Sequence, residues 1–184
     1  MEEGEKRDGA LARRAAAGDR EAFAALLERH YDRIFRVGAR VLGDADEAAD
    51  LAQDVCVALP ARLASWRGES RFTTWLYRVV VNAARDALRR KDARRRGERS
   101  FAETQALLRI DDASPACESG WLRRALGQLP DDLRVTVFLV LEEELRHAEA
   151  GEVLGVSEST VSWRMHEVRK RLRALAAGGE EGSS

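Results

Sequence analysis

The sequence has few of the residues that crosslink or interrupt a fold. Its 184 residues include two cysteines, Cys56 and Cys117, which lack the paired spacing of a disulfide framework or a zinc site. We therefore expect a reducing, cytoplasmic location, with no metal and no cofactor. Three prolines and few runs of β-branched residues give little sign of strands. This composition predicts an all-α protein.

Long hydrophobic runs are also missing. The first twenty residues lack the apolar core of a signal peptide, and no later run approaches the length that spans a membrane. Hydrophobic residues still make up 45% of the chain, which excludes a wholly disordered protein. The 34% of charged residues favours thin helices with large solvated faces, in one ordinary domain or two small ones.

The charge is nearly balanced overall, at −1, but it is segregated along the chain. Residues 85–99 contain eight Arg or Lys and three Asp or Glu. Residues 44–54 contain five carboxylates and no basic residue. Segregation of this kind indicates two different partners rather than one.

Capping residues and apolar spacing predict three helices in a first domain. Asp19 is a good N-cap for a first helix that Gly43 ends, and Asp44 or Asp46 caps a second. Pro60 is expected to kink or stop the second helix near its end. Ser70 is expected to cap a third helix over residues 71–90.

The patterning resumes in a second domain. Residues 91–118 have mixed charge and weak periodicity, which predicts a flexible linker with a short helix at residues 101–108. Pro130 marks the start of a helix whose apolar residues, expected to be largely buried, are Leu133, Val137, Leu139, Val140 and Leu141. We predict an N-terminal segment (1–18), a first domain (19–96), a linker (97–119), a second domain (120–177) and a disordered tail (178–184).

The second domain contains helix-turn-helix spacing. Gly151 is small where two helices would cross, Gly155 suits a turn with positive φ, and Val161 returns the second helix to the core. The recognition helix would begin at Ser157 or Glu158. Its predicted outward or phosphate-facing residues are Trp163, Arg164, His166, Lys170, Arg171 and Arg173. The alternative is an ordinary helical hairpin with a solvated basic helix.

The first domain combines aromatic and basic residues in a way that suits unpaired DNA. Trp66, Phe72, Trp75 and Tyr77 interleave with Arg67, Arg71 and Arg78, followed by Arg85, Arg89 and further basic residues to Arg96. A splayed base can stack on an aromatic ring while a cation holds the phosphate. Phe72 and Trp75 are better explained as core, which leaves Trp66 as the stacking candidate. Asn82 is either a satisfied core amide or a reader of a base edge.

These motifs together resemble the extracytoplasmic-function sigma factors of bacterial RNA polymerase, of the sigma-70 family. Asp50-Leu51-Ala52-Gln53-Asp54-Val55 is similar to the family's clamp-binding motif, and the stretch from Arg67 to Arg78 is similar to its promoter-melting segment. Without these neighbours, the acidic helix would be read as a solvated face. The resemblance covers nearly all of residues 18–173.

The resemblance implies a role for each matching residue. Asp50, Gln53 and Asp54 would hold the β′ clamp coiled coil of core polymerase, and the second domain would face the β flap. The −10 element would be bound by Trp66, Arg67, Gly68, Glu69, Ser70, Arg78, Asn82, Arg85 and Arg89. The −35 element would be bound by Thr160, Ser162, Trp163, Arg164, His166, Glu167 and Lys170. An anti-sigma factor is a further expected partner, and no membrane contact is expected.

The sequence departs from the family pattern at three places. Cys56 and Pro60 stand where bulkier residues are common, and Ser162-Trp163 replaces a basic residue followed by serine. The last departure puts inherited −35 preferences in doubt. The main alternative is a helix-turn-helix repressor or activator that acts without core polymerase. An enzyme, such as a helical metal hydrolase, is disfavoured because His30, His147 and His166 lack carboxylates at ligand spacing.

Overall fold

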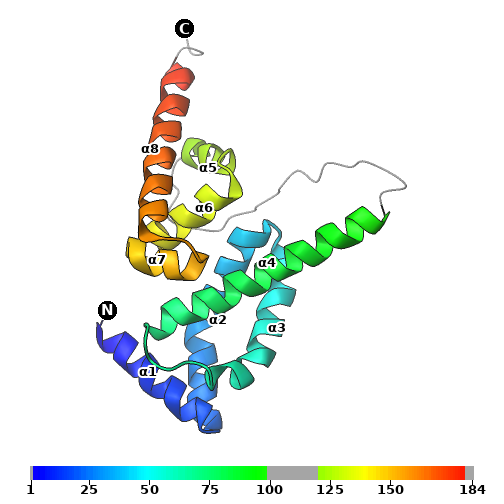
Figure 1. Cartoon of the computed structure of the whole chain (residues 1–184), viewed down its shortest axis with the longest axis vertical. Coiled ribbons are helices and arrows are strands. Elements are labelled where there is room, and N and C mark those ends of the chain that lie inside the picture. Colours follow the sequence, from blue (N-terminus) through cyan, green and yellow to red (C-terminus); the bar gives the residue numbers. More distant parts are fainter. Residues whose placement is uncertain (1, 99–119, 181–184) are drawn as a thin grey trace. The chain divides into compact units, whose positions relative to one another are not determined.

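The computed structural model describes residues 2–98 and 120–180, and every regular element in these ranges is a helix. The chain divides into two compact units, Met1–Ile110 and Asp111–Ser184 (Figure 1). These observations confirm the predicted all-α class and the two helical domains. The predicted helix at 101–108 and most of the predicted linker lie outside the described residues.

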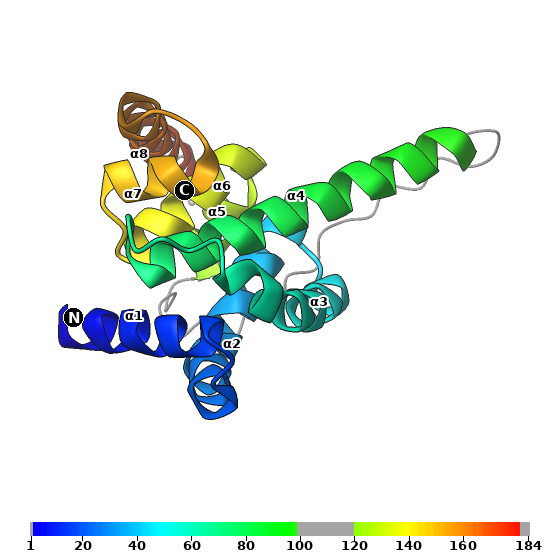
Figure 2. The ribbon, with the colours of Figure 1, turned by 60° about the horizontal axis from the view of Figure 1, so that its bottom comes forward.

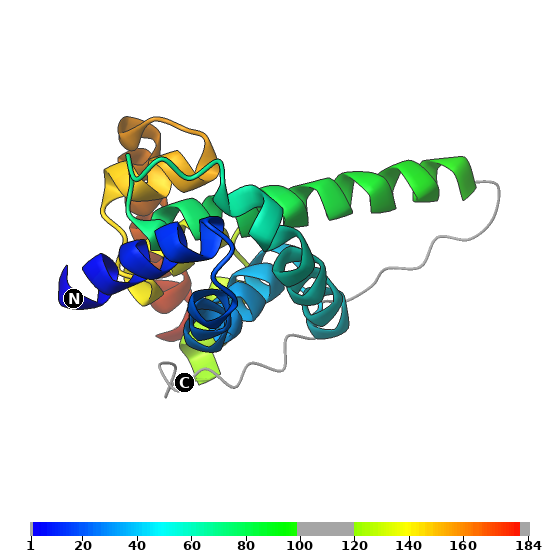
Figure 3. The same cartoon turned by 90° about the horizontal axis from the view of Figure 1, so that it is seen from below.

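The first unit is built from four helices that all contact one another. They are α1 (Glu2–Ala16), α2 (Arg20–Leu42), α3 (Ala45–Leu63) and α4 (Phe72–Glu98). Leu26 and Ile34 of α2, Leu59 of α3, and Leu76 and Val80 of α4 are buried between them. The last turns of α4 project beyond the other three helices (Figures 2 and 3).

The caps that the sequence predicts are present. The Asp19 carboxylate accepts hydrogen bonds from the backbone N–H groups of Glu21 and Ala22 at 3.0 Å, and these bonds, the one from Ala22 foremost, lower its pKa. Gly43 ends α2 with φ 71°. Asp44, rather than Asp46, caps α3 by accepting from the Glu47 N–H at 2.9 Å.

Three features of the first unit differ from the sequence prediction. Residues 1–18 were assigned no helix, yet α1 packs against α2, α3 and α4. Pro60 does not stop α3, which continues for three residues to Leu63 although the proline has no N–H to donate within the helix. Helix α4 begins at Phe72, with the Arg71 carbonyl accepting from the Trp75 N–H, and it runs eight residues past Arg90.

The second unit places four short helical segments around one long helix. They are α5 (Gly120–Gly127), α6 (Asp131–Val137), the π-helix η1 (Phe138–Glu142), α7 (His147–Leu154) and α8 (Glu158–Glu180). Helix α8 packs against α5, α6 and α7. Buried residues of this unit include Leu133, Leu139, Val153, Val161 and Met165.

Two predictions for this unit are wrong. Leu141 is 63% exposed, because the wider turn of η1 breaks the helical register that would have buried it. Helix α8 extends to Glu180, three residues into the predicted disordered tail, and residues 181–184 lie outside the described part.

Candidate functional site

The outer face of α3 carries the predicted acidic motif. Asp50, Gln53 and Asp54 are exposed, at spacings of three and four residues that place them on one helical face. Leu51, Ala52 and Val55 are buried on the opposite face. The helix therefore presents two carboxylates and an amide outward from a fixed core contact.

Val57 extends this face and was missed by the sequence reasoning. It is 82% exposed and follows Gln53 by four residues and Asp54 by three. Its seven-residue spacing from Asp50 was the available signal. We call Asp50, Gln53, Asp54 and Val57 the α3 face.

Two other carboxylates of the acidic run have structural partners. The Asp44 side chain caps α3, and Glu47 forms an ion pair with Lys91 of α4. The Asp44 carboxylate caps its own helix, and the Glu47–Lys91 pair joins α3 to α4. Asp50 and Asp54 of the α3 face, together with Asp46 in the first turn, are thus the exposed carboxylates of the run that no such contact among the described residues holds.

The loop between α3 and α4, residues 64–71, presents polar groups outward. Arg67, Gly68 and Glu69 are exposed, and Gly68 has φ 77°, a conformation that glycine adopts without strain. The Trp66 indole N–H donates to the Ser70 carbonyl at 3.3 Å and so closes the loop. We call residues 64–71 the α3–α4 loop.

The ring of Trp66 is lodged against protein side chains. It packs edge-on against Phe72, with ring centroids 5.8 Å apart, and the Arg13 guanidinium of α1 lies 5.9 Å from its centroid. Phe72 and Trp75 are buried, as predicted, and so is Tyr77. The indole therefore packs on Phe72 and Arg13 while its N–H holds the Ser70 end of the loop.

A polar stripe continues from the loop along α4. Arg78, Asn82, Arg85 and Arg89 recur at spacings of three and four residues, which place them on one helical face. Asn82 is exposed, so the core alternative for its amide is excluded. Arg89 pairs with Asp86, and Arg85 is half-buried.

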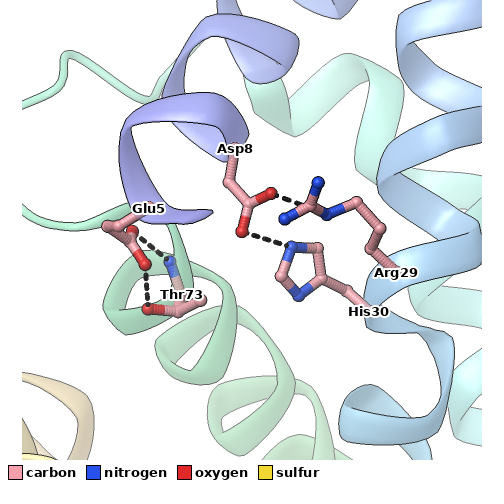
Figure 4. A network of polar contacts seen from close by, with 5 residues as sticks. All are labelled: Glu5, Asp8, Arg29, His30 and Thr73. Carbon is pink, nitrogen blue, oxygen red and sulfur yellow. Dashed lines mark hydrogen bonds and ion pairs between the residues drawn. The ribbon is translucent and has the colours of Figure 1, made fainter. Parts of the chain in front are cut away.

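Helix α1 carries a polar network that the sequence did not predict (Figure 4). Asp8 is buried; one carboxylate oxygen lies 3.0 Å from Nε of Arg29 and the other 3.0 Å from Nε2 of His30. His30 is only 2% exposed and packs on Phe72, with centroids 5.3 Å apart. Asp8 is 22 residues away from His30 in sequence, so this pairing is not the metal-ligand spacing that the sequence was found to lack.

The buried imidazole predicts a pH-dependent stability. Burial lowers the pKa of His30 against the opposing attraction of Asp8. The unfolded chain therefore binds more protons than the folded chain below the ordinary histidine pKa of about 6.5, and the free energy of unfolding falls as pH drops from about 7.5 to about 5.5. Urea denaturation at both pH values measures this fall, which should shrink in His30→Gln. An equal reduction in the exposed-histidine control His166→Gln would contradict the assignment to His30.

The second unit contains the predicted helix-turn-helix. A Cβ added to Gly151 would lie 2.8 Å from the Val156 carbonyl oxygen, so the turn approaches α7 too closely for a side chain. Gly155 ends α7 with φ 69°, and Val161 is buried. The recognition helix α8 begins at Glu158. The structure thus confirms the predicted roles of Gly151 at the helix crossing, Gly155 in the turn and Val161 in the core.

The exposed face of α8 carries part of the predicted DNA-binding set. Trp163 is 61% exposed, and Ser162, His166 and Lys170 are also exposed. The Ser162 hydroxyl lies 2.9 Å from Nδ1 of His147, the first residue of α7. His147 was not recognised in the sequence as a neighbour of this face.

Three other predicted residues are held by contacts within the unit. The Arg164 side chain is 14% exposed and pairs with Asp132 at 3.4 Å. Thr160 lies 2.8 Å from the Ser157 hydroxyl, and Glu167 pairs with Arg171 at 2.8 Å, which lowers the glutamate pKa. A DNA contact by Arg164 would require the guanidinium to leave Asp132.

The described residues contain neither a metal-binding cluster nor a membrane-spanning helix. Across residues 2–98 and 120–180, no three or more His, Cys, Asp or Glu side chains are grouped to hold a metal ion. None of the described helices combines the length and apolar character needed to cross a membrane. Cys56 is a half-buried free thiol whose pKa is raised by burial.

Two compact helical units, one with an acidic face and a polar loop and the other with a recognition helix, define a two-domain DNA-binding protein. Family profiles match both units: Sigma-70 region 2 over residues 26–94, and Sigma-70, region 4 over residues 119–172.

Curated relatives and solved structures show the same relationship. The ECF RNA polymerase sigma factor SigW of Bacillus subtilis is 30% identical over 85% of this chain and 89% of its own. SigM of Mycobacterium tuberculosis is 31% identical over 93% and 85%. The structure of CnrH with the cytosolic domain of CnrY matches with a TM-score of 0.65 and 27% identity, over 94% and 98%. Bartonella quintana RpoE, solved with the anti-sigma factor NepR, has a TM-score of 0.66 and 21% identity, over 84% and 96%, and shows the same fold.

The chain belongs to the extracytoplasmic-function sigma factors of the sigma-70 family. Its function is promoter-specific transcription with core RNA polymerase, as the two sigma domains together establish. The alternative of a repressor or activator independent of polymerase is not favoured, because region 2 accounts for most of the first unit.

Proposed function

We propose that this sigma factor divides promoter recognition among the α3 face, the α3–α4 loop with its polar stripe, and the exposed face of α8. The observation that carries the proposal is their chemistry. Acidic and apolar groups stand on α3, while polar and cationic groups stand on the next loop and helix. The chain then acts as a dissociable, non-catalytic subunit in the cytoplasm.

The α3 face is the proposed contact with core polymerase. Asp50 and Asp54 suit the basic coiled coil of the β′ clamp, and Gln53 can donate and accept beside them. Val57 adds an apolar surface to which a neighbouring side chain can pack. The β flap is the corresponding contact proposed for the second unit.

The α3–α4 loop and the stripe on α4 are the proposed −10 site. Arg67, Gly68, Glu69 and Ser70 would surround a base extruded from the duplex, with Trp66 as the floor of the loop. Asn82 would read a neighbouring base edge. The set is completed by cations for the backbone phosphates, namely Arg78, Arg85 and Arg89.

The exposed face of α8 is the proposed −35 site. Ser162, Trp163 and His166 face outward, where a recognition helix meets the major groove, and Lys170 follows as a phosphate ligand. Glu167 and Thr160 stand at its margin. Because Arg164 is paired with Asp132, we propose that it reaches DNA only after that pair opens.

An anti-sigma factor is the proposed regulatory partner. The solved structures of CnrH and of Bartonella RpoE contain partners named as a cytosolic domain and as an anti-sigma factor. A partner that covered the α3 face would compete directly with core polymerase. The exposed carboxylates and Val57 offer it the same surface chemistry.

Dependence on core polymerase tests the function. Transcription from a random promoter library with core enzyme would select the promoter, and that DNA should bind the holoenzyme specifically but the isolated protein weakly. The isolated protein should bind weakly because we propose that only core polymerase fixes the spacing of the two DNA-binding units. Gel-shift titration with and without core measures the difference, and a housekeeping sigma factor should compete for core. A tight, sequence-specific complex of the isolated protein with duplex DNA would count against the proposal.

A further inference from the structure

Helix α1 contacts the beginning of the α3–α4 loop through Trp66. A Cβ built on Gly9 would lie 3.2 Å from Cη2 of the indole, which is closer than most real Cβ contacts. Gly9 is buried, so the ring occupies the space that a side chain would take. Arg13, one turn further along α1, lies over the same ring. Helix α1 therefore restricts where the Trp66 ring can lie.

The same helix contacts Thr73, the second residue of α4 after the loop. The Glu5 carboxylate accepts a hydrogen bond from the Thr73 backbone N–H at 3.3 Å and another from the Thr73 hydroxyl at 3.0 Å (Figure 4). The first turn of α4 has no acidic residue of its own. Glu5 thus supplies the acceptor and the negative charge that a helix N-terminus favours.

The network of Asp8 fixes the helix between these two contacts. Asp8 joins α1 to Arg29 and His30 of α2, and His30 packs on Phe72. Phe72 in turn packs on Trp66. Both ends of the loop are therefore tied to one helix that is itself anchored by a buried carboxylate.

We propose that α1 positions the α3–α4 loop for base capture, and that Glu5 and Gly9 are positioning residues for promoter melting. The inference rests on the proposed function of the loop. No side chain of α1 needs to touch DNA. Helix α1 holds Trp66 and the start of α4 in place. The segment from Arg67 to Ser70 is therefore already ordered when the base binds, and binding does not carry the free-energy cost of ordering it.

The test compares intact and abasic DNA on the holoenzyme. The first probe is the selected promoter as a fork DNA whose −10 element is single-stranded. The other probes are copies of this fork, each lacking one base of the −10 element. Wild-type holoenzyme should lose roughly tenfold in affinity at the captured base. Gly9→Val and Glu5→Ala should bind the intact fork roughly tenfold more weakly than wild type, yet bind that abasic fork as wild type does.

Matched variants distinguish a loss of loop positioning from a general loss of stability. Gly4→Val adds the same side chain to α1, where a Cβ meets only Nη2 of Arg29 at 3.8 Å, and it should behave as wild type. Glu5→Gln keeps an acceptor for Thr73 and should recover most of the lost affinity. Competition for core polymerase should be unchanged in all four variants.

Each outcome has one meaning. Equal weakening on intact and abasic forks would show a general structural effect and overturn the positioning role. If wild type were indifferent to every abasic site, base capture by the loop would itself fail, and the inference with it. If wild type responds but neither variant changes that response, only the inference fails. Should Gly9→Val not fold, the comparison of Glu5→Ala with Glu5→Gln decides.

Discussion

Reversing the charge at Asp50 and Asp54 together, with lysine at both positions, is expected to abolish binding to core polymerase while leaving the fold intact. Both side chains are exposed on the α3 face, so the substitution disturbs no core contact. Close charge pairs across protein interfaces have coupling energies of about 1.5–7 kcal/mol, and two reversals replace attraction by repulsion. The affinity should therefore fall by at least about a hundredfold, as measured by competition with a housekeeping sigma factor.

A matched control removes the effect of net charge. Glu28→Lys with Asp32→Lys changes the same number of charges at the same four-residue spacing, on exposed positions of α2. This variant should bind core polymerase nearly as wild type does. If both double variants lost affinity equally, the α3 face would not be the docking surface and the overall charge would be responsible.

Placing valine at Gly151 is expected to destabilise the helix-turn-helix unit. Even a Cβ would lie 2.8 Å from the backbone oxygen of Val156, and the two γ-methyl groups of valine have no rotamer that relieves this contact. Overpacking typically costs about 1–3 kcal/mol, and a clash with backbone belongs at the upper end. Circular dichroism should show a lower melting temperature, and −35-dependent binding by the holoenzyme should be lost.

Gly127→Val provides the comparison for this result. It makes the same substitution at an exposed site where a Cβ would meet no atom within 4 Å. Its melting temperature should stay near that of wild type. Normal stability and −35 recognition in Gly151→Val would refute the tight helix crossing described for this unit.

The sequence predicted the features that depend on neighbouring residues. Asp19 was recognised as a cap, and Asp44 was one of two candidates for the next cap, because the groups they bond lie two or three residues away. Gly155 was recognised because a turn with positive φ has a strong residue preference. Phe72 and Trp75 were placed in the core from helical spacing alone.

Features that depend on distant residues were missed. The buried face of α1 includes Ala12 and Ala15, small side chains that give a weak amphipathic signal. Its polar contacts join Asp8 to His30 and Glu5 to Thr73, across 22 and 68 residues of sequence. His30 therefore gave no sign of a carboxylate partner. Ser70 was expected to cap α4, but the carboxylate that accepts from the Thr73 N–H is Glu5 of α1, which is also distant in sequence.

The sequence indicated which of the predicted site residues are exposed better than it indicated their contacts. The exposed positions of the α3 face and of Asn82 agree with predicted contact roles, but those roles stay predictions. Arg164 has the residue type of a phosphate ligand, yet its pairing with Asp132 depends on how α6 meets α8. Val57 shows the opposite case, an exposed apolar residue that the sequence marked only by its helical spacing from Asp50.

The anchoring of α1 also bears on where this domain can be cut. The region 2 profile begins at residue 26, beyond the end of α1. A fragment trimmed to residues 26–94 would leave His30 without Asp8 and the first turn of α4 without the Glu5 carboxylate. The profile boundary therefore marks where sequence similarity starts, and we expect a fragment of residues 26–94 to be less stable than one that begins before Glu5.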